Sequence, residues 1–202
     1  MSEMVTLPAP QKELDFPLMK ALANRRSTRK WSDKPLSKQD LSNLLWAACG
    51  QTREQKGRTT KSKRTTPSAC NAQEIRVYVL LEDGVFHYHD DVHALEQTHS
   101  VDVREFIGTQ KMMKSAPAGL VFVADLSRMT SPLFRSEEIK QFFAWVDTGY
   151  ISQNVYLFCA AFDLGTVSLG LVDRDLLGEK IGLNAHEKIV LTQVVGYLKN
   201  NL

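Results

Sequence analysis

Apolar residues recur at helical spacing in two parts of the chain. Ser37 and Asp40 open the first part with the S-x-x-D pattern of a helix N-terminus, and Gly50 follows its last apolar position. The second part covers residues 136–162 and has one apolar face. We predict a helix in each part, and a short helix over residues 18–24. The periodic positions are Leu41, Leu44, Leu45 and Ala48 in the first part and Ile151, Val155, Phe158 and Phe162 in the second.

Alternating and continuous apolar runs predict β-strands. Residues 74–81 alternate and are rich in Val, Ile and Tyr, and the Asp-Gly pair that follows predicts a hairpin turn into residues 85–88. Residues 119–126 and 190–198 have the composition of buried strands. Together these runs predict a sheet of about four or five strands. Because strands and helices do not alternate regularly, the pattern favours an α+β layer fold.

The length of the chain suits a single domain. With 202 residues and 43% hydrophobic composition, it can bury one sizeable core. Residues 1–17 contain three prolines and little periodicity, so we expect an extended arm, laid on a partner surface or disordered. Residues 18–202 are then the single folded domain.

Composition argues against several classes of partner. Twenty-five Lys and Arg against 23 Asp and Glu leave a formal charge of +2, so we expect no nucleic-acid partner. The longest apolar runs are too short to span a bilayer, so we expect no membrane partner. Cys49, Cys70 and Cys159 are an odd count without C-x-x-C spacing, which indicates neither a zinc site nor a disulfide framework. A reducing compartment, the cytoplasm, is the simpler expectation.

Basic residues gather in residues 51–66. We interpret this segment as a mobile, solvated loop, because charge runs usually serve solubility. The functional alternative is a lid that meets an anionic cofactor, and nucleic-acid binding through the loop is the weakest hypothesis. The basic residues are Arg53, Lys56, Arg58, Lys61, Lys63 and Arg64.

Two short motifs carry candidate binding chemistry. Residues 25–29, Arg-Arg-Ser-Thr-Arg, lie where the first predicted helix ends, and guanidinium forks with a hydroxyl suit a phosphate monoester. The alternative is solvated surface. Residues 67–73, Pro-Ser-Ala-Cys-Asn-Ala-Gln, form a turn that enters a strand, and its amide side chains suit the edge of a flavin-like ring. The alternative is an Asx-stabilised turn.

A third motif, residues 164–170, reads Leu-Gly-Thr-Val-Ser-Leu-Gly. Its G-x-x-x-x-G spacing is not a P-loop, because Leu171 and Val172 stand where Lys and Ser or Thr are required. No G-x-G-x-x-G motif is present either. Taken alone, Gly165 has the pattern of a helix C-cap.

A histidine-rich stretch and two tryptophans have other interpretations. Residues 87–93, His-Tyr-His-Asp-Asp-Val-His, place two imidazoles on one face of a strand with carboxylates nearby, which is a divalent-metal arrangement. Because a polar hairpin tip is usually exposed, we expect no metal site there. Trp46 and Trp145 lie on predicted helices and favour core or interface packing over flavin stacking.

In their order and separations, the three motifs resemble those of the FMN-dependent nitroreductase family. That family has an Arg-x-Ser-x-Arg or Lys element, a Pro-Ser-x-x-Asn-x-Gln turn entering a strand, and later a helix followed by Leu-Gly-Thr. The similarity runs from about Leu18 to Tyr197. Residues 44–48 and 64–68 also resemble the subgroup related to thiazole- and oxazole-forming dehydrogenases. The resemblance implies a central, mostly antiparallel sheet flanked by helices, in a homodimer with FMN at the interface.

The resemblance also implies which residues bind the cofactor. The first motif would hold the FMN phosphate and ribityl end, and a lysine near the C-terminus would complete the phosphate site. The second would line the flavin ring, its serine reaching from the other subunit. The third would run beside the ring, with the N–H of its last glycine pointing toward flavin N5. These residues are Arg25, Arg26, Ser27 and Arg29; Ser68, Asn71 and Gln73; Ser168, Leu169 and Gly170; and Lys199.

The sequence departs from the family pattern at two positions. Glu74 replaces the proline that often follows the Gln, which places a negative charge at the strand entrance. Leu198 follows Gly196-Tyr197 where proline is common, and the chain has a short C-terminal end. These departures motivate an alternative function, a flavin-binding sensor or partner-binding protein without turnover.

The activity that the resemblance implies is an FMN-dependent NAD(P)H oxidoreductase. Hydride from NADH or NADPH would reduce the flavin, and a small acceptor such as a nitroaromatic or quinone would then be reduced over the same ring face, with ping-pong kinetics. Because flavin carries the redox chemistry, we expect no essential catalytic side chain.

Overall fold

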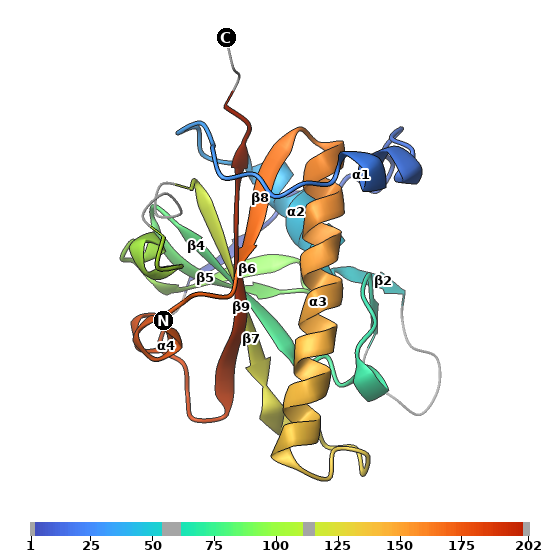
Figure 1. Ribbon diagram of the computed structural model, residues 1–202, viewed down its shortest axis with the longest axis vertical. Helices are drawn as coiled ribbons and strands as arrows, with labels where there is room; N and C mark the ends of the chain where they lie inside the picture. Colours follow the sequence, from blue (N-terminus) through green and yellow to red (C-terminus); the bar gives the residue numbers. More distant parts are fainter. Residues whose placement is uncertain (1–2, 54–61, 111–115, 200–202) are drawn as a thin grey trace.

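The computed structural model describes residues 3–53, 62–110 and 116–199, and a seven-stranded sheet forms its centre (Figure 1). The strand order is β1-β6-β5-β4-β7-β9-β8, and each pairing in this sheet is antiparallel. The predicted α+β fold with a central antiparallel sheet flanked by helices is confirmed. The strands are β1 (Glu3–Thr6), β4 (Ile75–Leu81), β5 (Gly84–His89), β6 (Ala94–His99), β7 (Ala118–Asp125), β8 (Leu164–Leu169) and β9 (Glu187–Tyr197).

Helices cover both faces of the sheet. The long helix α3 lies along one face beside α2 (Figure 1), and the Asn154 amide of α3 donates a 2.9 Å hydrogen bond to the Ala47 carbonyl of α2. Helix α4 packs on the opposite face. No helix in the described ranges is long and apolar enough to cross a membrane. The helices are α1 (Leu18–Asn24), α2 (Lys38–Cys49), α3 (Glu137–Ala161) and α4 (Arg174–Lys180), with short 3-10 turns at Ala69–Asn71, Arg104–Phe106 and Leu126–Arg128.

The helix ends follow the signals in the sequence. The Ser37 hydroxyl accepts the Asp40 N–H at 3.0 Å, and Ser136 accepts the Ile139 N–H at 3.3 Å in the same way at the start of α3. Gly50 caps the end of α2, where a Cβ would lie 2.3 Å from the Trp46 ring. The predicted helices over 18–24, 37–50 and 136–162 are therefore confirmed to within a residue or two.

The sheet separates two apolar cores. Successive side chains of a strand point to opposite faces, so Val77 and Val79 of β4 pack toward α2 and α3, whereas Tyr78 and Leu80 pack toward α4. Strand β7 alternates in the same way, and it is buried on both faces. This central position explains its continuous apolar run.

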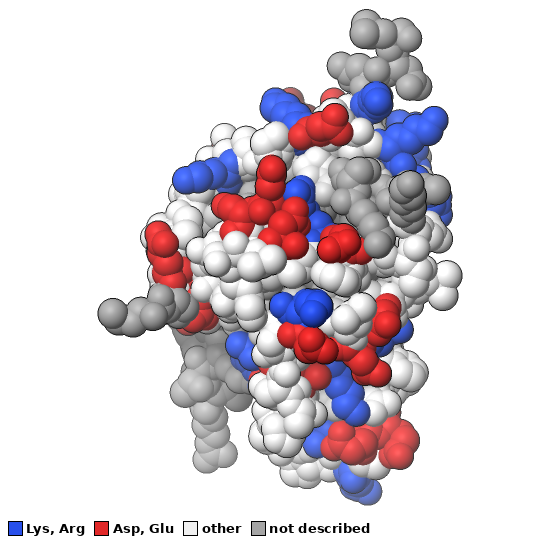
Figure 2. Space-filling model, turned by 90° about the vertical axis from the view of Figure 1, so that its left-hand side faces the viewer, with Lys and Arg blue, Asp and Glu red and all other residues white. Residues whose placement is uncertain are grey.

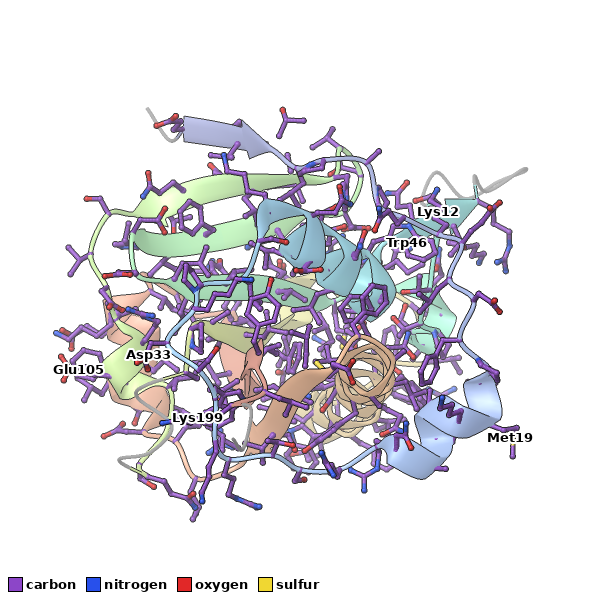
Figure 3. All side chains as sticks on the ribbon, turned by 90° about the horizontal axis from the view of Figure 1, so that it is seen from above. Lys12, Met19, Asp33, Trp46, Glu105 and Lys199 are labelled. Carbon is purple, nitrogen blue, oxygen red and sulfur yellow. The ribbon has the colours of Figure 1, made fainter. Side chains whose placement is uncertain are left out.

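The N-terminal strand β1 belongs to the chain's own sheet. The sequence predicted an arm over residues 1–17, laid on a partner or disordered, but β1 pairs with β6 in the same chain. The segment after β1 then crosses α2, where Lys12 lies 5.3 Å above the Trp46 ring (Figure 3). Strand β1 was missed because three of its four residues are exposed and show no apolar alternation.

The predicted count of four or five strands was also too low because β6 and β8 were missed. The interpretation of Gly165 as a helix C-cap was wrong, since Gly165 lies in β8 opposite Gly196. The left-handed position after α3 is instead occupied by Asp163, with φ of 52°. Asp tolerates that conformation better than most residues, so no glycine was needed to end the helix.

The described part of residues 51–66 forms a small sheet rather than a solvated loop. Strand β2 (Gln51–Arg53) pairs with β3 (Lys63–Arg64), and Arg64 is buried in a bidentate ion pair with Asp90. The other three basic residues of the predicted loop, Lys56, Arg58 and Lys61, lie outside the described residues. Elsewhere on the surface, Figure 2 shows a face on which acidic and basic side chains are intermingled.

Candidate functional site

The arginine motif at residues 25–29 is fastened to strand β8. The Thr28 N–H donates to the Thr166 carbonyl at 2.8 Å, and the Trp31 indole N–H donates to the Gly165 carbonyl at 2.9 Å. A Cβ on Gly165 would lie 2.9 Å from the Thr28 methyl and 3.1 Å from the Trp31 ring nitrogen. The absence of a side chain at Gly165 therefore lets the first motif lie close to strand β8.

Tyr156 of α3 connects the first and third motifs. Its hydroxyl lies 3.1 Å from Ser27 Oγ and 3.3 Å from Ser168 Oγ, and it accepts the Ser168 N–H at 3.0 Å. The Arg25 guanidinium lies 5.3 Å from the centre of the Tyr156 ring, a cation–π contact. Burial opposes ionisation of this phenol, but hydrogen bonds with Ser168 and Ser27, together with the Arg25 charge, lower its pKa overall.

Tyr156 was not among the site residues predicted from the sequence. The available signal was a hydroxyl-bearing aromatic next to Val155, on the apolar face of the predicted long helix. This signal does not say which residues the hydroxyl contacts. Its partners, Ser27 and Ser168, come close only when the segment after α1 and strand β8 meet at the same end of α3.

The arginines of the first motif face two open hollows. Arg25 and Arg26 line a hollow of about 390 Å³ with Tyr156, and Arg29 lines a separate one of about 180 Å³ with residues 167–171. No acidic side chain in the described ranges forms an ion pair with these three arginines. Three arginines that form no ion pair, beside open space, are suited to bind an anion, and Asp163 is the one acidic residue of the described ranges that lines the larger hollow.

Gly170, at the end of the third motif, borders open space. A Cβ built on this residue would meet nothing within 4 Å in the chain, and its carbonyl accepts a 3.3 Å hydrogen bond from Arg174. Ser168 and Leu169 precede it as the last residues of β8. The predicted residues of the first and third motifs are thus brought together at one end of the sheet.

The second motif forms a strained turn. Cys70, Asn71 and Gln73 all have positive φ angles, between 52° and 53°, which non-glycine residues rarely adopt. The Ser68 hydroxyl accepts the Gln73 N–H at 3.0 Å, and the Gln73 amide donates to Asn71 Oδ1 at 3.1 Å. Gln73 is 5% exposed, so in this chain its side chain holds the turn together.

The second motif lies away from the other two within one chain. Its Ala69 N–H donates to Asp147 Oδ2 at 2.8 Å, whereas the first and third motifs contact Tyr156. Positions 147 and 156 on α3 are nine residues apart, which corresponds to about 13 Å along the helix. Within one chain the motifs therefore form two separate groups, and we call the group of the first and third motifs the arginine half-site.

Lys199 follows a residue that lines the hollow of the first motif. It is exposed, and it follows Leu198, which pairs with Trp31 and lines the same hollow as Arg25 and Arg26. Figure 3 shows Lys199 on the same side of the molecule as Asp33. Lys199 is far from the first motif in the sequence, so only the family resemblance suggested that the two lie at the same end of the molecule.

Glu74, next to the second motif, is completely buried. Its side chain is 0% exposed, and no donor in the described part of the chain hydrogen-bonds to either carboxylate oxygen. Burial first, and then the like charge of Asp147, raises the pKa of Glu74 to about 7. The sequence predicted a full negative charge here, but with this pKa about half of the Glu74 carboxyl groups are protonated at pH 7.

Comparisons with known proteins agree with this architecture. The chain is similar to a protein of Methanocaldococcus jannaschii that is named as a nitroreductase, with 28% identity over 77% of this chain and 79% of that protein. A solved structure from Ralstonia eutropha, described as a nitroreductase, is 35% identical and superposes with a TM-score of 0.88, covering 98% of this chain and 90% of that one. The NADPH:FMN oxidoreductase of Vibrio harveyi shares the fold, with a TM-score of 0.64, 18% identity and coverage of 91% and 70%.

The family model described as "Nitroreductase family" matches residues 22–197. This match includes all three motifs and nearly all of the folded chain. The chain therefore belongs to the nitroreductase family.

Proposed function

We propose that this protein is an FMN-dependent oxidoreductase that takes hydride from NADH or NADPH and reduces a small acceptor, such as a nitroaromatic or a quinone. Membership of the nitroreductase family supports an oxidoreductase. The observation that carries the proposal is the set of unpaired arginines held beside the open end of β8. The Vibrio harveyi enzyme with the same fold is named for NADPH and FMN and was solved with NAD+.

The residues present fit an FMN phosphate. Arg25, Arg29 and the Ser27 hydroxyl would hold its oxygens, because a phosphate monoester carries a charge of about −1.5 to −2 and guanidinium forks bind it well. Arg26 and Lys199 would add positive charge at the same end. The Ser27–Tyr156–Ser168 contacts would keep this end rigid, so little ordering is needed when the anion binds.

The open end of β8 fits a flat ring. Nothing in the chain occupies the space next to Gly170, so a planar group can approach the backbone of residues 168–170. When bound, flavin accepts hydride from a nicotinamide and passes reducing equivalents to an acceptor. The chain contributes binding, orientation and exclusion of water, and no side chain is required to carry a proton in this proposal.

We propose that the active form is a homodimer with FMN at the interface. The Ser68–Gln73 turn and the arginine half-site lie about 13 Å apart along α3 in one chain, so a second copy would have to supply Ser68 and Asn71 to the ring. Helix α3 also carries exposed aromatic side chains that a second copy could cover. These are Phe142, Trp145 and Tyr150, with exposed fractions of 56%, 61% and 46%.

The location that we propose is the cytoplasm. Cys49, Cys70 and Cys159 are all free thiols, in agreement with the reducing compartment expected from the sequence. The narrower resemblance to thiazole- and oxazole-forming dehydrogenases stays a prediction.

Purified protein tests the proposal directly. The full chain should be yellow as isolated or after incubation with FMN, and stopped-flow mixing with NADH or NADPH should bleach the flavin absorption. Arg25→Ala and Arg29→Ala should each weaken FMN binding by about 10- to 100-fold, because each removes a charge-assisted hydrogen bond worth about 1.5–3 kcal/mol. Arg135→Ala, at an exposed arginine outside the site, is the matched control.

Two results would count against parts of the proposal. A protein that neither contains FMN nor binds it on reconstitution would refute the flavin site itself. Flavin that binds but is not reduced by either nicotinamide would favour the alternative, a flavin-binding sensor or partner-binding protein.

A further inference from the structure

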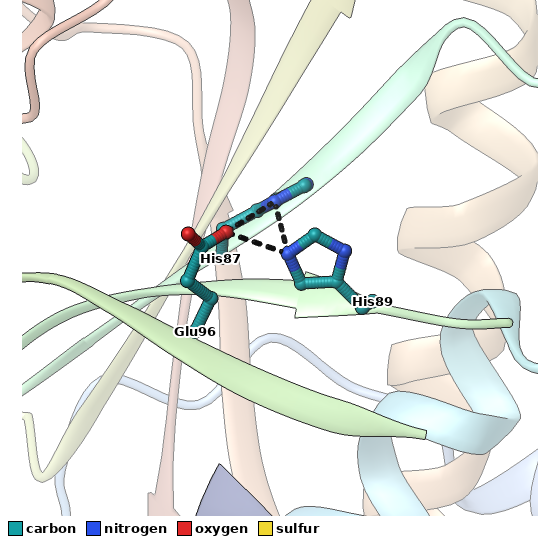
Figure 4. Close-up of side chains that lie close together, drawn as sticks. All are labelled: His87, His89 and Glu96. Carbon is teal, nitrogen blue, oxygen red and sulfur yellow. Dashed lines mark hydrogen bonds and ion pairs between the residues drawn. The ribbon is translucent and has the colours of Figure 1, made fainter. Parts of the chain in front are cut away.

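Three potential metal ligands meet on neighbouring strands β5 and β6. His87 and His89 are two residues apart and therefore lie on the same face of β5. Glu96 of β6 is the direct cross-strand partner of His87. Figure 4 shows the two imidazoles and the carboxylate pointing toward one another. The arrangement comes from strand register, so the backbone holds all three groups in place.

The spacing of the three ligand atoms suits one small cation. His89 Nε2 lies 2.8 Å from Glu96 Oε2 and 3.0 Å from His87 Nδ1, and His87 Nδ1 lies 4.0 Å from Glu96 Oε2. A tetrahedral Zn²⁺ with bonds of about 2.0–2.2 Å separates its ligand atoms by about 3.3–3.5 Å. The three distances lie on both sides of this range, so changes of about 0.5 Å in these separations would complete the geometry.

The donors and acceptors of the cluster compete for the same partners. His89 Nε2 faces both Glu96 and His87, and it has one position for either a proton or a lone pair. Arg76 donates its Nε–H to His87 Nε2 at 3.2 Å, and its Nη2 lies 3.5 Å from His87 Nδ1. When the proton of a neutral His87 is on Nδ1 and the His89 Nε2–H donates to Glu96, two N–H groups point at each other. A cation would use all three lone pairs at once.

The surroundings keep the histidines available as ligands. His87 is only 7% exposed, so its ring is held in place among its neighbours. The sequence-based expectation of no metal assumed an exposed hairpin tip, and that assumption was wrong for His87. A polar hollow of about 550 Å³ borders both imidazoles and provides a path for an ion and for water.

Nearby charges partly oppose a cation and set the expected strength of binding. Arg76 is paired with Glu187, and Arg64 is paired with Asp90. Arg128 also lines the hollow, and no ion pair for it is seen in the described part of the chain. Arg76 must move away from both nitrogens of His87 before Nδ1 can bind a metal ion and Nε2 can carry the proton. We therefore expect micromolar rather than nanomolar affinity.

We propose that His87, His89 and Glu96 bind one divalent transition-metal ion, such as Zn²⁺ or Co²⁺, with water from the hollow as the fourth ligand. Two imidazoles and one carboxylate with an open position form a donor set typical of zinc. The proposal does not depend on the flavin function, because its test reads metal binding alone.

Titration of the tag-free full chain with Co²⁺ and Zn²⁺ tests the site. We expect one ion per chain, with visible Co²⁺ absorption typical of tetrahedral coordination that added Zn²⁺ abolishes. Glu96→Gln and His89→Ala should each weaken binding at least tenfold. His186→Ala, at an exposed histidine outside the cluster, should leave binding unchanged. Wild-type protein with no Co²⁺ absorption and no heat of Zn²⁺ binding at 0.1 mM ion would overturn the proposal.

A variant that binds the ion more tightly is also needed, because weaker binding by a variant could result from misfolding. Arg76→Gln replaces a donor by a side-chain carbonyl that can accept the His87 Nε2–H, the outer contact that metal-bound histidines usually make. We expect it to bind Zn²⁺ at least tenfold more tightly than wild type. If Arg76→Gln binds no more tightly and Glu96→Gln no more weakly than wild type, the ion is bound elsewhere and the assignment is wrong.

Discussion

Tyr156 meets Ser27 across 129 residues of sequence, with 3.1 Å between their hydroxyl oxygens. The same phenol accepts the backbone N–H of Ser168. Helix α3 therefore fixes the position of the arginine motif relative to the end of β8. This relationship makes the half-site a preformed unit, in which binding energy is not spent on ordering the loop.

Removing the Tyr156 hydroxyl should loosen this half-site. Tyr156→Phe keeps the ring beneath Arg25 but leaves the Ser168 N–H without its acceptor, which should lower the free energy of unfolding by about 1–2 kcal/mol. FMN affinity should fall several-fold. Urea unfolding and flavin titration measure the two effects. Arg135→Ala, at an exposed residue just before the same helix, should change neither, and equal flavin affinities for Tyr156→Phe and wild type would disprove the role of the phenol.

Two glycines of the third motif should respond differently to the same substitution. Gly165→Ala forces a Cβ to within 2.9 Å of the Thr28 methyl, so we expect a loss of about 1–3 kcal/mol in stability and weaker FMN binding. Gly170→Ala meets nothing within 4 Å in the chain, so its stability should stay within about 0.5 kcal/mol of wild type while FMN affinity falls. Thermal unfolding with and without FMN separates the cases. A Gly170→Ala protein that binds FMN normally would show that the ring lies elsewhere.

The ion pair of Arg64 with Asp90 should be important for stability. Both side chains are largely buried, with exposed fractions of 8% and 14%, and the guanidinium also donates to the Ile75 carbonyl at 3.1 Å. Asp90→Ala leaves a buried charge unpaired, which typically costs about 3–5 kcal/mol. Asp91→Ala, at the neighbouring exposed carboxylate, should cost less than about 0.5 kcal/mol. Similar urea midpoints for the two variants would contradict this assignment.

Local signals in the sequence predicted the elements that depend on local physics. The Ser37 cap, the Gly50 stop and the Asp-Gly hairpin turn each act within a few residues, and α2 and the β4–β5 hairpin form where they were predicted. Strands β1 and β6 were missed because they lie near the edge of the sheet, where partial exposure removes the apolar alternation. Such strands are identified by their pairing in the folded sheet rather than by apolar alternation in the sequence.

The candidate site was predicted in parts. The sequence identified the arginine motif and the Ser168–Gly170 segment, and the structure brings them together through Thr28 and Thr166. It could not identify Tyr156 or the cross-strand position of Glu96, because both depend on pairings between distant segments. The sequence also predicted a negative charge for Glu74. Burial decides the protonation of this carboxyl group, and burial cannot be predicted from the residue type alone.

Glu74 should make the stability of the protein fall as the pH rises toward neutrality. Its pKa in the folded state is about 7, above its ordinary value of 4.5, so folding favours the protonated carboxyl group. The associated stability is complete below about pH 4.5 and is lost as the pH rises through 7. Urea unfolding at pH 5 and pH 8 measures this loss, which we expect to be on the order of 1–3 kcal/mol.

Glu74→Gln isolates that contribution, because glutamine has nearly the same shape and does not ionise. The variant should be more stable than wild type at pH 8. At that pH, wild type must either hold a buried carboxylate beside Asp147 or keep the carboxyl group protonated in a solution where protons are scarce, and both cost free energy. At pH 5 the two proteins should differ much less. If Glu74→Gln shows the same decline between pH 5 and pH 8 as wild type, the pH dependence arises from a group other than Glu74.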